Sequence, residues 1–236
     1  ANLKPMLAFN RIKLIVFDLD GTLVDSVADL EWCANEMLNR LGMTMLPAGV
    51  ARSYVGNGVE RFVKRALSGE MSAEPDSQLF DRGLELFSGL YAVHNSERSQ
   101  PYPGVLECLQ RLSRLELKLA CVTNKAERFT LGLVEAMGFG EYFELLVCGD
   151  TTSRKKPDPM PLQYAADHFG LQSRQCLMVG DSSNDVTAAR AANFGIVCVP
   201  YGYNHGDDIA DSDPDLVIGN LTGLAELFEQ EEARCN

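Results

Sequence analysis

Histidine is scarce in this sequence, and the positions of its few copies argue against two common kinds of hydrolase. The chain has three histidines, His94, His168 and His205, and none of them follows a run of strand-forming residues. Histidine ligands hold most catalytic zinc ions, and a histidine base completes the Ser-His-Asp triad. We therefore expect neither a histidine-based zinc site nor a serine-hydrolase triad.

Long apolar segments and paired cysteines are also missing. No apolar run approaches the roughly 18 residues of a membrane-spanning helix. The seven cysteines are an odd number without a Cys-x-x-Cys pair, and Cys121, Cys148 and Cys198 lie inside strand-like apolar runs. We expect them to be buried thiols of a protein from a reducing compartment. Residues 1–11 lack the charged region and apolar core of a secretory signal, so we expect a cytoplasmic protein.

Basic residues are outnumbered, with 21 lysines and arginines against 33 aspartates and glutamates and a net charge of -12. A chain this acidic is not expected to bind nucleic acid or an anionic membrane. If its substrate is an anion, local cations must attract it. The length of 236 residues fits one large domain, or one domain with a smaller insertion. Nothing in the sequence decides between a monomer and a homodimer.

Helical periodicity without a convincing strand dominates the chain between residues 27 and 95. The periodic segments cover residues 27–41, a short stretch from Pro47, 59–69 and 80–91. A polar segment that ends at Pro101 follows them and predicts a linker. We therefore expect residues 24–99 to form a helical cap domain inserted into a different fold.

Strand-like and helical segments alternate strictly in the rest of the chain. The expected strands are 12–17, 117–122, 143–148, 176–179, 196–199 and 216–218, and the expected helices are 105–112, 126–137, 158–170, 184–193 and 221–232. Repeated β-α units predict a parallel sheet with helices on both faces. Residues 1–23 and 100–236 should therefore form a doubly wound α/β core.

Polar side chains follow several of these strands directly, and such strand ends share one edge of a parallel sheet. They are Asp18 and Asp20, Thr123 and Asn124, Asp150, and Asp181 with Asp185. Carboxylates this close together repel each other unless a cation or a proton lies between them. All-oxygen ligation suits magnesium, so we expect Mg²⁺ at this edge. Asp150 fits a solvated loop equally well and is not assigned to the site.

Cations and helix-opening residues gather at the same edge. Arg154-Lys-Lys156-Pro follows the strand at 143–148, and Thr123-Asn124-Lys125 opens a helix whose first amides can hold an anion. A metal ion, a lysine, a threonine hydroxyl and such amides together make a phosphate-binding site. A nearby aspartate can attack phosphorus and form an acyl-phosphate.

Four motifs, in their order along the chain, resemble those of the haloacid dehalogenase superfamily of phosphatases. They are Asp18-Leu-Asp20-Gly-Thr-Leu-Val-Asp-Ser26, Thr123-Asn124, Lys156-Pro157 and Gly180-Asp181-Ser-Ser-Asn184-Asp185. The resemblance implies a Rossmann-like core, and the helical insertion resembles the small helical cap of one subgroup.

The resemblance also implies roles for the acids. Asp18 would be the nucleophile and a metal ligand. Asp20 would protonate the leaving oxygen and then activate water, while its carbonyl would touch the metal ion. Asp181 would be a metal ligand, and Asp185 would support the metal site directly or through water. Dehalogenase members lack an acid at the position of Asp20, so its presence favours phosphoryl transfer.

For the phosphate, the resemblance implies Thr123, Asn124 and Lys156, since Lys156 directly precedes Pro157 and matches the motif better than Lys155. One segment of the expected cap resembles bacterial phosphoglycolate phosphatases in particular. It is Tyr54-Val-Gly-Asn-Gly-Val-Glu-Arg-Phe62. That resemblance implies hydrolysis of 2-phosphoglycolate, a small phosphorylated acid. The candidate residues for its carboxylate are Gly56, Asn57, Gly58 and Arg61.

Other interpretations of these motifs fit less well or remain open. Asp18-x-Asp20-Gly differs from a calcium-binding loop, which has its glycine at the sixth position and a helix before it. Gly56-Asn-Gly58 lacks the third glycine of a dinucleotide-binding motif and follows a helix. Thr123-Asn124 and Ser182–Asn184 are compatible with plain helix caps. The alternatives for the function are another phosphate ester, a phosphosugar mutase, and a non-catalytic protein on the same scaffold.

Overall fold

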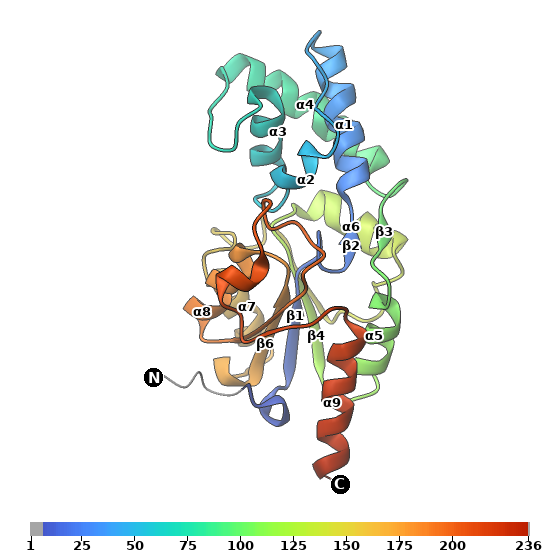
Figure 1. The fold of residues 1–236 in the computed structure, drawn as a ribbon, viewed down its shortest axis with the longest axis vertical. Helices are drawn as coiled ribbons and strands as arrows, with labels where there is room; N and C mark the ends of the chain where they lie inside the picture. The colour runs from blue at the N-terminus through green and yellow to red at the C-terminus, as the bar shows by residue number, and fades with distance from the viewer. Residues whose placement is uncertain (1–6, 236) are drawn as a thin grey trace.

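The protein, described over residues 7–235 in a computed structural model, consists of a six-stranded parallel sheet between helices and a separate group of helices above it (Figure 1). The strand order in the sheet is β5-β4-β1-β6-β7-β8, and every paired neighbour is parallel. The strands are β1 (Leu14–Phe17), β4 (Lys118–Val122), β5 (Leu145–Val147), β6 (Cys176–Gly180), β7 (Gly195–Cys198) and β8 (Leu216–Val217). The predicted α/β class and parallel sheet are confirmed.

Strand β1 lies in the middle of the sheet and is buried on both faces. Its four residues are fully buried, and it pairs with β4 on one side and with β6 on the other. Leu14 and Val16 point to one apolar cluster, whereas Ile15 and Phe17 point to the other. This alternation explains why the strand reads as an unbroken apolar run.

Helices cover both faces of the sheet (Figure 1). One cluster contains residues of α5 (Val105–Leu112), α6 (Glu127–Ala136) and α9 (Thr222–Cys235), and the other contains residues of α7 (Met160–His168) and α8 (Ser183–Ala192). Alanines such as Ala188 and Ala189 let α8 pack closely against β6 and β7. No helix within residues 7–235 is long and apolar enough to cross a membrane.

The helices of the inserted segment pack around an apolar cluster of their own. They are α1 (Val27–Arg40), α2 (Val50–Tyr54), α3 (Val59–Ser68) and α4 (Ser77–His94). Helix α2 begins at Val50 and not at Pro47, because Gly49 precedes it in a left-handed conformation. Phe129 and Tyr203 of the α/β part join this cluster, so the two parts share an apolar contact.

The connection between the two parts is more ordered than the sequence predicted. The expected linker contains β3 (Gln100–Pro101), which pairs antiparallel with β2 (Val24–Asp25). Asp29 lies beside this pair, is fully buried, and accepts hydrogen bonds from the backbone amides of Arg98 and Ser99 at 2.7–3.0 Å. The Ser99 hydroxyl adds another at 2.6 Å. The buried carboxylate of Asp29 therefore links the start of helix α1 to the segment that leads into β3.

The expectation about a secretory signal rests partly on residues 1–6, which lie outside the described residues.

Removal of the Asp29 carboxylate should destabilise the protein, because it leaves two backbone amides and a hydroxyl without their acceptor. We expect Asp29→Ala to lower the free energy of unfolding by about 3 kcal/mol in a urea titration. Asp81→Ala, which changes an exposed acid of α4, is the control and should stay within about 0.5 kcal/mol of the wild type. A loss below about 1 kcal/mol for Asp29→Ala would contradict this role.

Candidate active site

The carboxyl end of β1 presents two acids to the same edge of the sheet. Leu19, between them, is fully buried in the core, so the flanking Asp18 and Asp20 turn the other way and are partly exposed. Gly21 then takes φ = 90°, and a Cβ there would lie 2.3 Å from an oxygen of Asp181. Glycine is therefore required both for the turn and for the close approach of Asp181.

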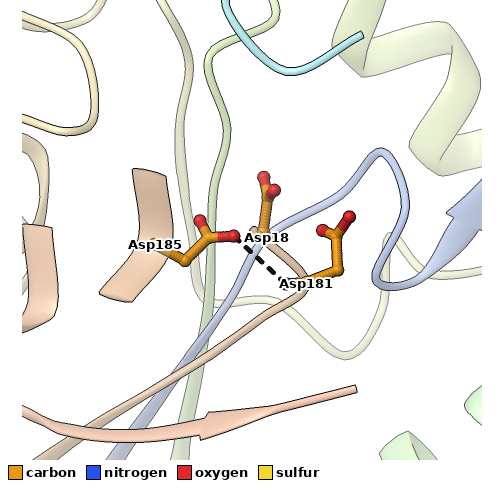
Figure 2. A group of neighbouring side chains, drawn as sticks. All are labelled: Asp18, Asp181 and Asp185. Carbon is orange, nitrogen blue, oxygen red and sulfur yellow. Dashed lines mark hydrogen bonds between the residues drawn. The ribbon is translucent and has the colours of Figure 1, made fainter. Parts of the chain in front are cut away.

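Three carboxylates meet at this edge, from the ends of β1 and β6 and from the start of α8. Asp18, Asp181 and Asp185 each offer an oxygen, and these oxygens lie within 4.8 Å of one another (Figure 2). Because β1 and β6 are paired neighbours, their ends bring Asp18 and Asp181 together. The structure thus brings together three of the four residues that the sequence assigned to a metal site, and the carboxylate of Asp20 is not among them.

The three carboxylates differ in how many of their oxygens are already engaged. Asp185 accepts bonds from the backbone amides of Asp181 and Ser182 through Oδ2 and from Lys156 through Oδ1. Asp181 accepts from the Thr22 hydroxyl at 2.8 Å through Oδ1 and from the backbone amide of Tyr203 at 2.5 Å through Oδ2. Asp185 is thus the most fully engaged of the three acids.

Lys156 neutralises part of this cluster. Its Nζ lies 2.9 Å from Oδ1 of Asp18 and 2.7 Å from Oδ1 of Asp185, and its side chain is only 2% exposed. Burial opposes the charge, but the two carboxylates outweigh it and raise the pKa of Lys156. Lys155, its neighbour, is exposed. The structure places Lys156, and not Lys155, on the candidate nucleophile.

One ammonium does not compensate three carboxylates, and the pKa values of Asp18 and Asp181 reflect this. Burial raises the pKa of Asp18 to about 7 even though Lys156 opposes the shift, and burial together with Asp18 and Asp185 raises the pKa of Asp181 well above its ordinary value. A cation bound between the acids would remove the repulsion. The set of oxygen donors therefore fits a hard metal ion.

Thr123 and Asn124 follow β4 beside the carboxylates. Thr123 lines the same cavity as Asp18. The Asn124 amide donates to the carbonyls of Gly56 and Lys156, both at 2.9 Å. Asn124 thus connects the cap loop to the lysine loop, while its own Oδ1 is buried without a partner.

The cavity lies between the edge of the sheet and the cap and encloses about 420 Å³, its mouth included. The sheet side contributes polar residues, and the cap side is mostly apolar. The lining consists of Asp18, Asp20, Thr123, Asn124 and Lys125 from the core and Leu30, Val55, Gly56, Gly58, Val59 and Phe62 from the cap. A small molecule held here would have polar side chains on its core side and mostly apolar side chains on its cap side.

Two of the four candidate cap residues line this cavity, and two do not. Gly56 and Gly58 are part of the wall. Asn57 instead accepts a hydrogen bond from Arg65 at 2.9 Å, and Arg61 forms an ion pair with Glu74 at 2.8 Å. The structure therefore does not bring Arg61 to the cavity.

Lys125 is a residue at the cavity whose side chain the sequence interpretation overlooked. Its Nζ lies 2.7 Å from Oδ1 of Asp20, which also accepts a 2.5 Å bond from the Ser26 hydroxyl. In the Thr123-Asn124-Lys125 triplet, the sequence interpretation uses Lys125 only for its backbone amide. The sequence signal that could have identified its side chain was a second lysine close to a strand end.

Asp150, which was not assigned to the site, is exposed and accepts a hydrogen bond from the amide of Glu127 at the start of α6.

The fold and the carboxylate-lysine cluster define one class of hydrolase. The chain belongs to the haloacid dehalogenase-like hydrolase family, whose model matches residues 15–199. The family predicted from the four motifs is confirmed.

More particular likenesses are found among individual proteins. A protein from Nitrosococcus oceani named phosphoglycolate phosphatase is 50% identical over 218 residues, which cover 92% of this chain and 97% of that relative. A protein of the same name from Nitrosospira multiformis is 45% identical over 219 residues, with 93% and 96% covered. The solved structure of a predicted phosphoglycolate phosphatase from Haemophilus somnus matches with a TM-score of 0.87 at 32% identity and covers 92% of this chain and 98% of its own.

The raised pKa of Asp18 predicts how pH and a divalent cation should act together on stability. Without a metal ion, folded Asp18 keeps its proton up to about pH 7, whereas an ordinary carboxyl loses it near 3.8. The folded state then holds more protons between these values, so the stability of the metal-free protein should fall as the pH rises through this range. Added Mg²⁺, which binds deprotonated carboxylates, should therefore raise the Tm more at about pH 8 than at about pH 5.5.

Circular dichroism melts with and without Mg²⁺ measure this difference, and Asp18→Asn should reduce its pH dependence, because Asp181 is then the remaining acid with a raised pKa. A shift of Tm that is the same at both pH values in the wild type would contradict the assignment.

Proposed function

We propose that this protein is a Mg²⁺-dependent phosphatase that hydrolyses 2-phosphoglycolate to glycolate and inorganic phosphate through an aspartyl-phosphate on Asp18. The observation that carries the proposal is the buried Lys156 ammonium, which lies 2.9 Å from Asp18 in a cluster of three carboxylates. The names of the relatives support the choice of substrate. A small phosphorylated acid is the expected partner, and the reaction is proposed to take place in the cytoplasm.

The first step transfers the phosphoryl group to the protein. A carboxylate oxygen of Asp18 attacks phosphorus, and the bond between phosphorus and the glycolate oxygen breaks. Asp20, two residues further on, gives its proton to that oxygen, so glycolate leaves with its hydroxyl restored. Lys156 holds the Asp18 carboxylate in place and neutralises charge on the transferred group.

The second step releases phosphate. Asp20, now deprotonated, takes a proton from a water molecule that attacks the phosphorus of the aspartyl-phosphate. The bond between phosphorus and the Asp18 oxygen breaks, which restores the Asp18 carboxylate and yields inorganic phosphate. The Thr123 hydroxyl and the amides at the start of the following helix are proposed to bind the phosphate oxygens.

The metal ion would be held by the carboxylates of Asp18 and Asp181 and by the carbonyl of Asp20. Asp185 would support this site, since its oxygens already accept bonds from Lys156 and from the amides of Asp181 and Ser182. The ion, when bound, supplies positive charge next to the transferred phosphoryl group.

The cavity favours a short substrate over a long one. The cap loop closes it from above, because the carbonyl of Gly56 accepts hydrogen bonds from Asn124 at 2.9 Å and from Asn184 at 3.4 Å. Leu30, Val55 and Phe62 leave few polar partners on the cap side for the many hydroxyls of a sugar. These features support a small phosphorylated acid as the substrate.

A phosphate-release assay across small phosphorylated acids, sugar phosphates and nucleotides tests the proposal. We expect Mg²⁺-dependent release with the highest kcat/KM for 2-phosphoglycolate, and no turnover for Asp18→Asn, whose folding is checked by circular dichroism. A higher kcat/KM for a sugar phosphate or a nucleotide would overturn the assignment of 2-phosphoglycolate as the substrate. Release that persists in Asp18→Asn would overturn the mechanism, and return of phosphate to an organic product would indicate a mutase.

Replacement of Lys156 tests its role separately. Lys156→Ala should lower kcat/KM by about a hundredfold or more, because the charge that faces the transferred group is lost. Lys155→Ala, which removes the exposed neighbour, is the matched control and should change kcat/KM by less than about threefold. A loss below about twofold in Lys156→Ala would show that the ion pairs of Lys156 do not contribute to catalysis.

A further inference from the structure

Lys125 is a buried cation that lies between the core and the cap. Its side chain is 4% exposed, and its Nζ donates to Asp20 at 2.7 Å and to the Tyr91 hydroxyl of α4 at 2.5 Å. The same ammonium lies 4.9 Å from the centre of the Tyr91 ring. Burial opposes its charge, but Asp20 and Tyr91 more than compensate and raise the pKa of Lys125.

The ammonium has a hydrogen-bond donor to spare. A lysine carries three N–H donors, and the two bonds to Asp20 and Tyr91 use two of them. Lys125 also lines the cavity. The remaining donor can therefore serve an acceptor that enters the cavity.

The chemistry of the proposed substrate places an acceptor close to Asp20. Asp20 must reach the leaving oxygen in order to protonate it. In 2-phosphoglycolate a single methylene separates that oxygen from the carboxylate. A cation that binds the carboxylate must therefore lie close to Asp20, and Lys125 is in direct contact with it.

Two arginines of the cap are engaged with partners other than the cavity. Arg61 is paired with Glu74, and Arg65 donates to the carbonyls of Tyr54 and Met71. Among the lining residues found within the described part of the chain, 7–235, Lys125 is the only one with a positive charge.

We propose that Lys125 determines the substrate preference of this enzyme, because its ammonium binds the carboxylate of the substrate while Asp20 and Tyr91 hold it in place. This proposal rests on the proposed function and adds to it a residue of the core that recognises the carboxylate. Tyr91 belongs to the cap and Asp20 to the core. The ammonium therefore keeps both hydrogen bonds only while the cap lies against the core.

Two substrates that differ only in the carboxylate test this assignment. Ethyl phosphate has a methyl group where 2-phosphoglycolate has its carboxylate. The measured quantity is the ratio of kcat/KM for 2-phosphoglycolate to that for ethyl phosphate. Loss of a hydrogen bond to a charged group should lower this ratio about ten- to a hundredfold in Lys125→Met, and Lys125→Arg, which keeps a cation, should restore part of it.

Ser26→Ala is the matched control, because it removes the other hydrogen bond to Asp20 without removing a cation from the cavity. It should slow both substrates alike and leave the ratio within about twofold of the wild type. This control separates recognition of the carboxylate from a general disturbance of Asp20.

The outcomes distinguish this inference from the proposed function. A wild-type ratio near one overturns the phosphoglycolate assignment itself. A high wild-type ratio that stays within about twofold in Lys125→Met overturns only the role of Lys125. If Lys125→Met turns over neither substrate, calorimetry in Mg²⁺ with 3-phosphonopropionate and propylphosphonate measures the same preference as a ratio of Kd values. If it does not fold, Lys125→Gln takes its place in both assays.

Discussion

The interaction on which the site depends is the buried ammonium of Lys156 between Asp18 and Asp185. Three carboxylates within 4.8 Å would repel one another strongly in a buried place, and this lysine compensates only part of their charge. Burial, together with the carboxylates of Asp185 and Asp20, raises the pKa of Asp18 although Lys156 opposes the shift. The remaining negative charge leaves the site suited to a cation. The neighbouring positions of β1 and β6 in the sheet impose this arrangement.

The cap and the core are linked through the same groups that build the site. Tyr203 donates its backbone amide to Asp181 at 2.5 Å, and its hydroxyl accepts bonds from the amides of Ser26 and Val27 at the start of the cap. Asn124 joins the cap loop at Gly56 to the carbonyl of Lys156. The same residues therefore contact both the cap and the loops that carry Asp181 and Lys156.

Asp20 shows how one acid can be separated from its neighbours. It lies two residues from Asp18, yet its carboxylate is not one of the three that meet, and it accepts bonds from Lys125 and Ser26. A positive partner and a hydroxyl thus give Asp20 surroundings different from those of Asp18. That difference suits two acids with separate proposed tasks, one as nucleophile and one as proton carrier.

The sequence by itself determined the α/β fold and which acids follow the strands, because buried strands and helix faces leave patterns that depend on local order alone. The resemblance of four short motifs indicated the family. It also indicated Lys156 through its place before Pro157. Only the tertiary structure decided which side chains meet. Arg61 pairs with Glu74 and Lys125 with Asp20, contacts that depend on how α3, α4 and the end of β4 pack in space. Side-chain partners across elements leave no period in the sequence, so the partners of Arg61 and Lys125 could not be identified before the fold was known.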